Sequence, residues 1–128
     1  MTVFNLPIVG AFYRPPAKMI LDNLAVGTPL LLAAEPDNPH DPNAVAVWIT
    51  TADIPQPTLD VLELNLPNVG LDIESFVSVD QWHLGYIPKE WAAQLRLSGD
   101  VGPDTIVHGT FMVGDANKPN FRFDNPVL

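Results

Sequence analysis

The segment 28–50 reads TPLLLAAEPDNPHDPNAVAVWIT, and it decides the fold. Residues 28–34 contain three consecutive leucines, and residues 44–50 alternate branched apolar side chains with smaller residues and Trp48. Short apolar runs of this kind, bounded by turn-forming residues, are typical of strands. The segment therefore predicts two strands, Thr28–Ala34 and Ala44–Thr50, joined by a polar turn.

Further short elements are predicted on both sides of this pair. Apolar runs predict strands over residues 3–13, 82–87, 105–113 and 120–123. One short helix is predicted from about Ala17 to Ala25, before Gly27, and a second from Pro88 to Ser98-Gly99 with Trp91, Ala92 and Leu95 buried. The 14 prolines are spread along the chain, as expected where prolines lie in the turns between short strands and helices. The pattern predicts a mainly β fold, either a small β-barrel or a partly open sheet.

The segment 51–81 is the hardest to assign. It mixes prolines with apolar clusters, and residues 51–80 hold six acids and no base. We expect an acidic lobe or long loop inserted at one edge of the sheet, with its own strand or helical turn.

Length, composition and charge limit the class of protein. A chain of 128 residues predicts one domain, residues 1–128, and the absence of cysteine excludes disulfides, thiolate zinc sites and a cysteine nucleophile. No apolar run reaches the ~18 residues of a membrane span, and the N-terminus lacks a basic start. We therefore expect a soluble cytoplasmic protein without membrane contact. The net charge of −9 argues against sequence-blind binding of polyanions. The acidity is partly local, because the chain outside the acidic segment contains nine acids and six bases.

The turn 35–43, EPDNPHDPN, is the densest polar cluster. Asp and Asn beside proline favour Asx turns, in which the short side chain binds nearby backbone amides. A hard-cation site is the alternative, because Asp37, Asp41 and Asn43 carry oxygen ligands at alternating positions. The turn lacks the glycine and the distal glutamate of a calcium loop. We favour the Asx turn and predict no metal and no cofactor.

The basic residues lie next to aromatic residues. Arg14 and Lys18 follow Tyr13, Lys89 follows the junction Leu84-Gly85-Tyr86, and Lys118 and Arg122 flank Phe121. A single-stranded nucleic-acid site requires aromatic side chains on which bases stack and positive charges that bind the phosphate backbone. Such neighbours are also common in soluble proteins, and the junction alone is equally typical of a tight strand-to-helix turn.

Enzymatic activity is not predicted. The histidines, His40, His83 and His108, are far apart and form no metal-binding pattern. No serine lies in a nucleophile elbow, and no glycine-rich phosphate loop is present.

Three stretches, in this order, resemble the HIRAN domain family: Gly10-Ala11-Phe12-Tyr13, the run from Leu30 through EPDNPHDPNAVAV, and Leu84-Gly85-Tyr86-Ile87-Pro88. The resemblance covers residues 9–97 and continues more weakly to Phe123. It implies an OB-like β-barrel of about six strands with two short accessory helices. It also implies a DNA-binding module, since in a eukaryotic fork-remodelling translocase this domain captures the free 3′-hydroxyl end of single-stranded DNA.

The resemblance assigns roles to particular residues. Tyr13 would stack on a base near the end, and Asn38, His40 and Asp41 would line the pocket of the terminal nucleotide. Asp41 would accept a hydrogen bond from the 3′-hydroxyl, which a carboxylate can do while repelling a terminal phosphate. Tyr86 and Lys89 would contact the adjacent base and phosphate.

This sequence departs from the family pattern at several of these positions. Phe12 stands where an arginine is usual, and Arg14 would compensate; His40 replaces a tyrosine and Tyr86 replaces a histidine. Phe121 is the candidate for a second stacking aromatic residue.

The leading hypothesis is a module for single-stranded DNA, read at its free 3′-hydroxyl end, in DNA replication or repair, with a replication or repair protein as a further partner. The alternative is a protein-interaction module that uses the acidic lobe without binding DNA. A third option is an accessory to a hydrolase or nuclease, although this chain contains no set of catalytic residues.

Overall fold

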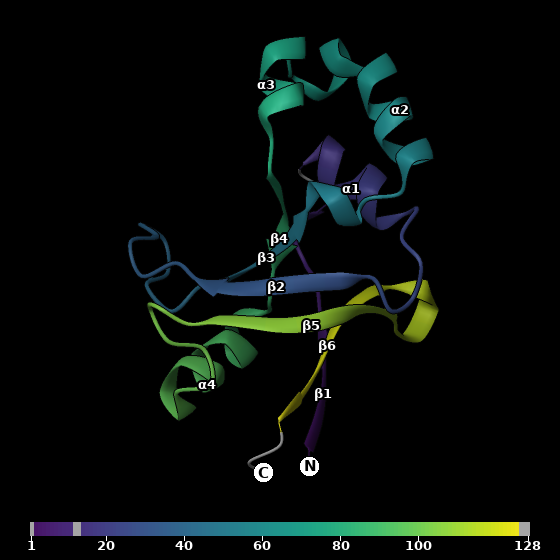
Figure 1. Ribbon diagram of the computed structural model, residues 1–128. Helices are drawn as coiled ribbons and strands as arrows, with labels where there is room; N and C mark the ends of the chain where they lie inside the picture. Colours follow the sequence, from purple (N-terminus) through teal and green to yellow (C-terminus); the bar gives the residue numbers. More distant parts are fainter. Residues whose placement is uncertain (1, 12–13, 126–128) are drawn as a thin grey trace.

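The computed structural model describes residues 2–11 and 14–125, and its fold is mainly β. Six antiparallel strands form one sheet in the order β1-β6-β5-β2-β3-β4 (Figure 1). They are β1 (Thr2–Pro7), β2 (Pro29–Ala34), β3 (Val45–Thr50), β4 (Gln81–Tyr86), β5 (Ile106–Val113) and β6 (Pro119–Asn125).

The sheet is not closed into a barrel, so the OB-like barrel is not confirmed. Its hydrogen-bonded ladders run from β1 at one edge to β4 at the other. Beyond the end of β1, one isolated bridge joins Val9 to Tyr86, with two backbone hydrogen bonds of 2.8 Å. Among the described residues, this bridge is the one backbone pairing that joins the segment after β1 to β4.

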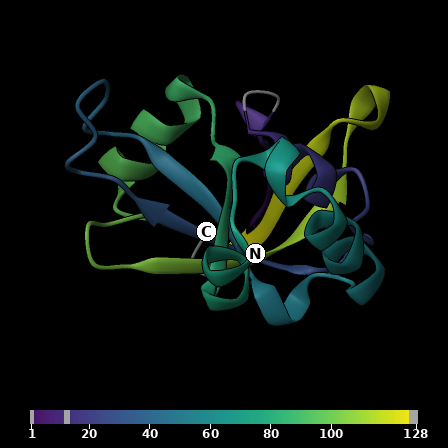
Figure 2. The same cartoon turned by 90° about the horizontal axis from the view of Figure 1, so that it is seen from above.

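Four α-helices accompany the sheet, where two were predicted: α1 (Pro15–Leu21), α2 (Gln56–Leu64), α3 (Ile73–Ser78) and α4 (Lys89–Ser98). The two additional helices, α2 and α3, lie between β3 and β4 with the 3-10 turns η2 (Thr51–Asp53) and η3 (Leu66–Val69). Another 3-10 turn, η4 (Asp115–Asn117), connects β5 to β6. The segment 51–80, which we call the helical lobe, stands beyond α1 at the top of Figure 1 and on the same side as α1 in Figure 2.

The central strands β2 and β3 confirm the prediction from segment 28–50. Leu30 and Leu32 of β2 are buried, while Leu31 between them is partly exposed. In β3, Val45, Val47 and Ile49 are fully buried. These inward side chains belong to one core cluster, which also includes Ile20 of α1, Leu62 of α2 and Leu95 of α4.

The first strand is shorter than predicted. The sequence predicts a strand over residues 3–13, whereas β1 ends at Pro7 and the chain turns at Gly10, whose φ is +84°. A positive φ is incompatible with a continuing strand and favours glycine. This turn directs the chain from the edge of the sheet into α1.

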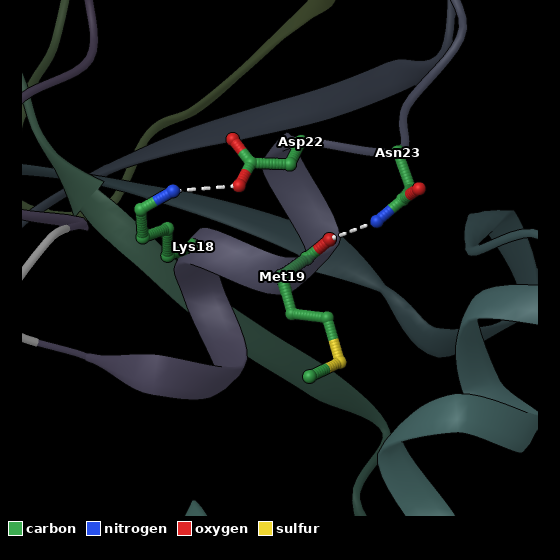
Figure 3. A network of polar contacts seen from close by, with 4 residues as sticks. All are labelled: Lys18, Met19, Asp22 and Asn23. Carbon is green, nitrogen blue, oxygen red and sulfur yellow. Dashed lines mark hydrogen bonds and ion pairs between the residues drawn. The ribbon is translucent and has the colours of Figure 1, made fainter.

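Helix α1 ends at Leu21, four residues earlier than predicted. The side-chain amide of Asn23 donates a hydrogen bond of 2.8 Å to the carbonyl of Met19, which otherwise would accept from the backbone of a continuing helix (Figure 3). Lys18 forms an exposed ion pair with Asp22 at 2.7 Å (Figure 3). The charge of Lys18 is thus matched within its own helix.

Helix α4 confirms its predicted end and corrects its predicted buried face. Gly99 follows it with φ +82°, the left-handed cap that glycine favours. Ala92 and Leu95 are buried as predicted, but Trp91 is 44% exposed. The narrow contact of a short helix buries positions three apart, and Trp91 lies about 100° away from Ala92 around the axis.

No helix among the described residues is both long and apolar enough to cross a membrane.

Candidate functional site

The turn between β2 and β3 is built from Asx turns. The side-chain oxygen of Asn38 accepts hydrogen bonds from the backbone amides of His40 and Asp41, at 2.9 and 3.1 Å. A carboxylate oxygen of Asp41 accepts one from the amide of Asn43 at 2.9 Å. The predicted Asx-turn structure is therefore confirmed, and these bonds hold the polar turn in one conformation.

Glu35 connects this turn to β4 through hydrogen bonds. One of its carboxylate oxygens accepts a hydrogen bond from the side-chain amide of Asn38 at 3.0 Å and another from the Tyr86 hydroxyl at 2.8 Å. The partners of Glu35 are 3 and 51 residues away in the chain. Sequence reasoning quoted Glu35 within the motif but gave it no role, because the contact with Tyr86 depends on the fold.

The end of β4 meets the start of α1 at Tyr86. The Arg14 guanidinium lies over the Tyr86 ring, 5.3 Å from its centroid, at a distance suited to a cation–π interaction. Arg14 also donates to the carbonyl of Gly10 at 3.5 Å. Tyr86 pairs with Val9 through its backbone, so the ring, the guanidinium and the polar turn are held around one point.

Six of the eight residues predicted to bind DNA line one cavity of about 400 Å³: Arg14, Asn38, His40, Asp41, Tyr86 and Lys89. Asn38, His40 and Tyr86 also line a neighbouring cavity of about 540 Å³ on the other side of the turn. The residues come from α1, the turn, β4 and α4. Arg96 of α4 donates a hydrogen bond of 3.0 Å to the carbonyl of Pro42, which fixes the turn against that helix. The role of these six residues in binding stays a prediction.

Of the other two predicted residues, only Phe121 belongs to the described part of the chain, and it does not line this cavity. The side chain of Phe121 is fully buried in the core, so its assignment as a stacking residue is wrong. Phe121 packs against Gly109 of β5, where a side chain would collide with its ring. Tyr13 and its neighbour Phe12 lie outside the described residues.

An aromatic array that the sequence analysis did not assign extends from Tyr86. The His83 ring meets the Tyr86 ring edge-on at 4.8 Å and stacks on Trp48 at 4.8 Å. A His83 ring nitrogen lies 3.0 Å from the carbonyl of Gly85, and because a carbonyl only accepts, this nitrogen carries the proton. The residues of the array come from two strands, and only the register of β3 against β4 brings them together.

The pKa shifts in this array favour neutral rings. Burial lowers the pKa of His83, and the nearby Arg14 guanidinium lowers it further. Burial also raises the pKa of the Tyr86 hydroxyl, as does its hydrogen bond to Glu35. At neutral pH both rings are therefore uncharged, and the charges of the site belong to Arg14, Lys89 and the carboxylates.

The cavity combines a carboxylate with two cations and aromatic surface. Asp41 is partly buried, and the described residues form only the one hydrogen bond from Asn43 to its carboxylate, so its other oxygen can accept from a ligand. Within the described part of the chain, no group of three or more His, Cys, Asp or Glu residues is arranged to hold a metal ion. The arrangement suits a ligand that offers a hydroxyl donor, a flat ring and an anionic backbone.

Comparison with protein families gives one match, a model of the HIRAN domain that covers residues 1–100. No significant match was found among curated proteins or among solved structures.

Proposed function

Since this chain belongs to the HIRAN domain family, whose domain is generally a DNA-binding module and not itself catalytic, we propose that it binds single-stranded DNA at a free 3′-hydroxyl end. Such ends arise in DNA replication and repair, where we place its role. The observation that carries this proposal is the cavity shared by Asp41, Arg14 and Lys89.

The chemistry of these three residues matches a strand end. The carboxylate of Asp41 accepts a hydrogen bond from a terminal hydroxyl and repels a terminal phosphate. Arg14 and Lys89 bind the phosphate between the last two nucleotides, which offsets the local negative charge. The flat faces of Arg14 and the exposed His40 are stacking surfaces for the terminal bases.

Asp41→Asn tests the assignment of Asp41 as the acceptor of a hydrogen bond from the 3′-hydroxyl. We expect the wild type to prefer a single strand with a 3′-hydroxyl over one with a 3′-phosphate by about tenfold, because a hydrogen bond to a charged group contributes roughly 1.5–3 kcal/mol. Asp41→Asn should weaken binding to the hydroxyl strand and strengthen binding to the phosphate strand. Fluorescence anisotropy with labelled strands, at low and moderate salt, measures both affinities.

Asp37→Asn is the matched control. It makes the same charge change in the same turn, but Asp37 is exposed and lines only the neighbouring cavity. It should therefore leave the preference for the hydroxyl unchanged. Equal effects of the two substitutions would reduce the role of Asp41 to general repulsion, and a wild type without end preference would refute the proposed function.

The helical lobe supports a second candidate function, binding of a basic protein partner. All six of its acids, Asp53, Asp60, Glu63, Asp72, Glu74 and Asp80, are exposed, and no base lies among them. Its helices also expose apolar side chains at helical spacing: Val61 with Leu64 on α2, and Ile73 with Val77 on α3. Leu64 is 82% exposed and Val77 72%. Exposed apolar side chains among acids fit an amphipathic basic helix.

A double change, Leu64→Ser with Val77→Ser, tests this surface. A synthetic amphipathic peptide rich in lysine and leucine should bind the wild type and lose about tenfold in affinity for the variant, because two buried apolar contacts are removed. Leu97→Ser on α4, at a position 91% exposed, is the control and should have no effect. If the peptide binds the double variant as tightly as the wild type, its attachment is purely electrostatic and the lobe is not a specific docking surface.

A further inference from the structure

A row of side chains crosses the sheet on the face opposite the core, which we call the outer sheet face. The ladder pairs His83 of β4 with Trp48 of β3, Trp48 with Leu31 of β2, and Leu31 with His108 of β5. Directly paired residues place their side chains on the same face of a sheet. The four side chains therefore form one continuous row from the aromatic array beside Tyr86 to the far strand.

Three cavities lie along this row, and the first of them belongs to the candidate site. The 540 Å³ cavity beside the polar turn shares Ala34 and Glu35 with a cavity of about 230 Å³ that is lined by Trp48, Leu31 and Ile106. On the next strand pair, a cavity of about 430 Å³ is lined by His108, Thr110 and Arg122. Ile106, which lines the cavity at Trp48, and His108, which lines the cavity of about 430 Å³, lie two residues apart on β5.

The described side chains that line the cavities at Trp48 and at His108 include one acid, Glu35, and one base, Arg122, in contrast to the net charge of −9 of the chain. The described side chains that line the cavity at its far end include no acid, and Arg122 forms no ion pair with any described residue. The cavity at Trp48 contains one acid, Glu35, and one of its oxygens already accepts two hydrogen bonds. The acids of the helical lobe belong to a different part of the fold, between β3 and β4.

We propose that the outer sheet face binds the nucleotides on the 5′ side of the last three, with Trp48 as a stacking platform and Arg122 as a phosphate contact. This inference rests on the proposed function, because it extends the strand whose end lies in the candidate site. The row from His83 to His108 spans three strand spacings, about 14 Å. A four-stranded sheet face can stack about two or three bases.

The dependence of affinity on strand length tests the proposal. We expect the wild type to bind a 3′-hydroxyl strand of about 12 nucleotides at least tenfold more tightly than a trinucleotide, since each stacked base adds roughly 1–3 kcal/mol. Trp48→Ala should lower the affinity for the long strand about tenfold and change that for the trinucleotide less than about twofold. Arg122→Gln should reduce the salt dependence of long-strand binding by about one ion.

Two further variants separate stacking from folding. Trp91→Ala makes the same change at an exposed position on α4 that lines none of these cavities, and should leave both affinities unchanged. Trp48→Phe keeps an aromatic platform and should retain most of the affinity for the long strand. Circular dichroism of each variant shows whether Trp48→Ala has retained the fold.

The outcomes distinguish this proposal from the one on which it rests. Equal affinity of the wild type for the trinucleotide and the long strand, or equal loss for both strands in Trp48→Ala, overturns the role of the outer sheet face. A wild type that binds long strands without preferring a 3′-hydroxyl overturns the end-binding function. In that case a loss of long-strand affinity in Trp48→Ala still supports the outer sheet face.

Discussion

Replacing Gly85 with alanine should lower the free energy of unfolding by about 3 kcal/mol. Gly85 has φ +154°, which side chains rarely adopt, and an added Cβ would collide with the carbonyl oxygen of Val9 and lie 3.2 Å from the Cγ2 of Ile8. The methyl group therefore forces the chain after β1 away from β4. This breaks the bridge between Val9 and Tyr86, which joins the segment after β1 to β4.

Gly27→Ala is the control for this prediction. Gly27 has φ +94°, but nothing lies within 4 Å of an added Cβ. It should therefore show the backbone strain alone, about 1 kcal/mol. Urea denaturation of the three proteins, followed by tryptophan fluorescence, gives the comparison. Equal losses in both variants would show that β1 and β4 separate freely and that the bridge does not hold the candidate site.

Local sequence signals were sufficient for the central strands and for the polar turn. The alternation of Val45, Val47 and Ile49 requires only the two-residue period of a strand. The Asx turns involve partners two or three residues apart, so the identities of Asn38 and Asp41 were enough to predict them.

The error at Phe121 arises from the same two-residue period. Phe121 was assigned to the site because it lies next to bases in the sequence, but neighbours in a strand point to opposite faces. Phe121 and Phe123 are buried, while Arg122 lies on the outer sheet face. Applying the period to residues 121–123 would have placed Arg122 on the face opposite the core and Phe121 in the core.

The helical lobe was only partly predictable, because its helices are short. Proline at the start of α2 and Asp72 as the N-cap of α3, where its carboxylate accepts from the amide of Ser75 at 2.7 Å, are local signals of helix starts. These hydrogen bonds also lower the pKa of Asp72, which keeps it charged. Helices this short are not stable on local signals alone, and Leu62 and Phe76 connect them to the core cluster.

The aromatic array and the contacts of Glu35 were not predictable from local signals. A register shift interrupts the pairing of β3 with β4 between Val47 and Trp48. This bulge sets which residues of β4 face Trp48 and directs Tyr86 toward Glu35. A contact over 51 residues that depends on a bulge leaves no pattern in one sequence.

Glu35 yields the second large effect, because its charge and its geometry predict opposite results for DNA binding. If Glu35 acted only through its charge, any neutral replacement would strengthen the binding of a polyanion. If it acts by holding the polar turn against Tyr86, only a replacement that keeps the acceptor oxygen preserves binding. We expect the second behaviour, since the hydrogen bonds at Glu35 connect both sides of the candidate site.

Glu35→Ala should therefore weaken binding of a 3′-hydroxyl strand about tenfold and lower the free energy of unfolding by about 2 kcal/mol, because two hydrogen bonds to a charged, partly buried acceptor are lost. Glu35→Gln keeps an oxygen that can accept from Asn38 and Tyr86, so it should bind as tightly as the wild type or more tightly. Anisotropy and urea denaturation of both variants measure these quantities. Stronger binding by Glu35→Ala than by Glu35→Gln would show that the acid acts only by repulsion, and the polar turn would then hold its shape through the Asx turns of Asn38 and Asp41 alone.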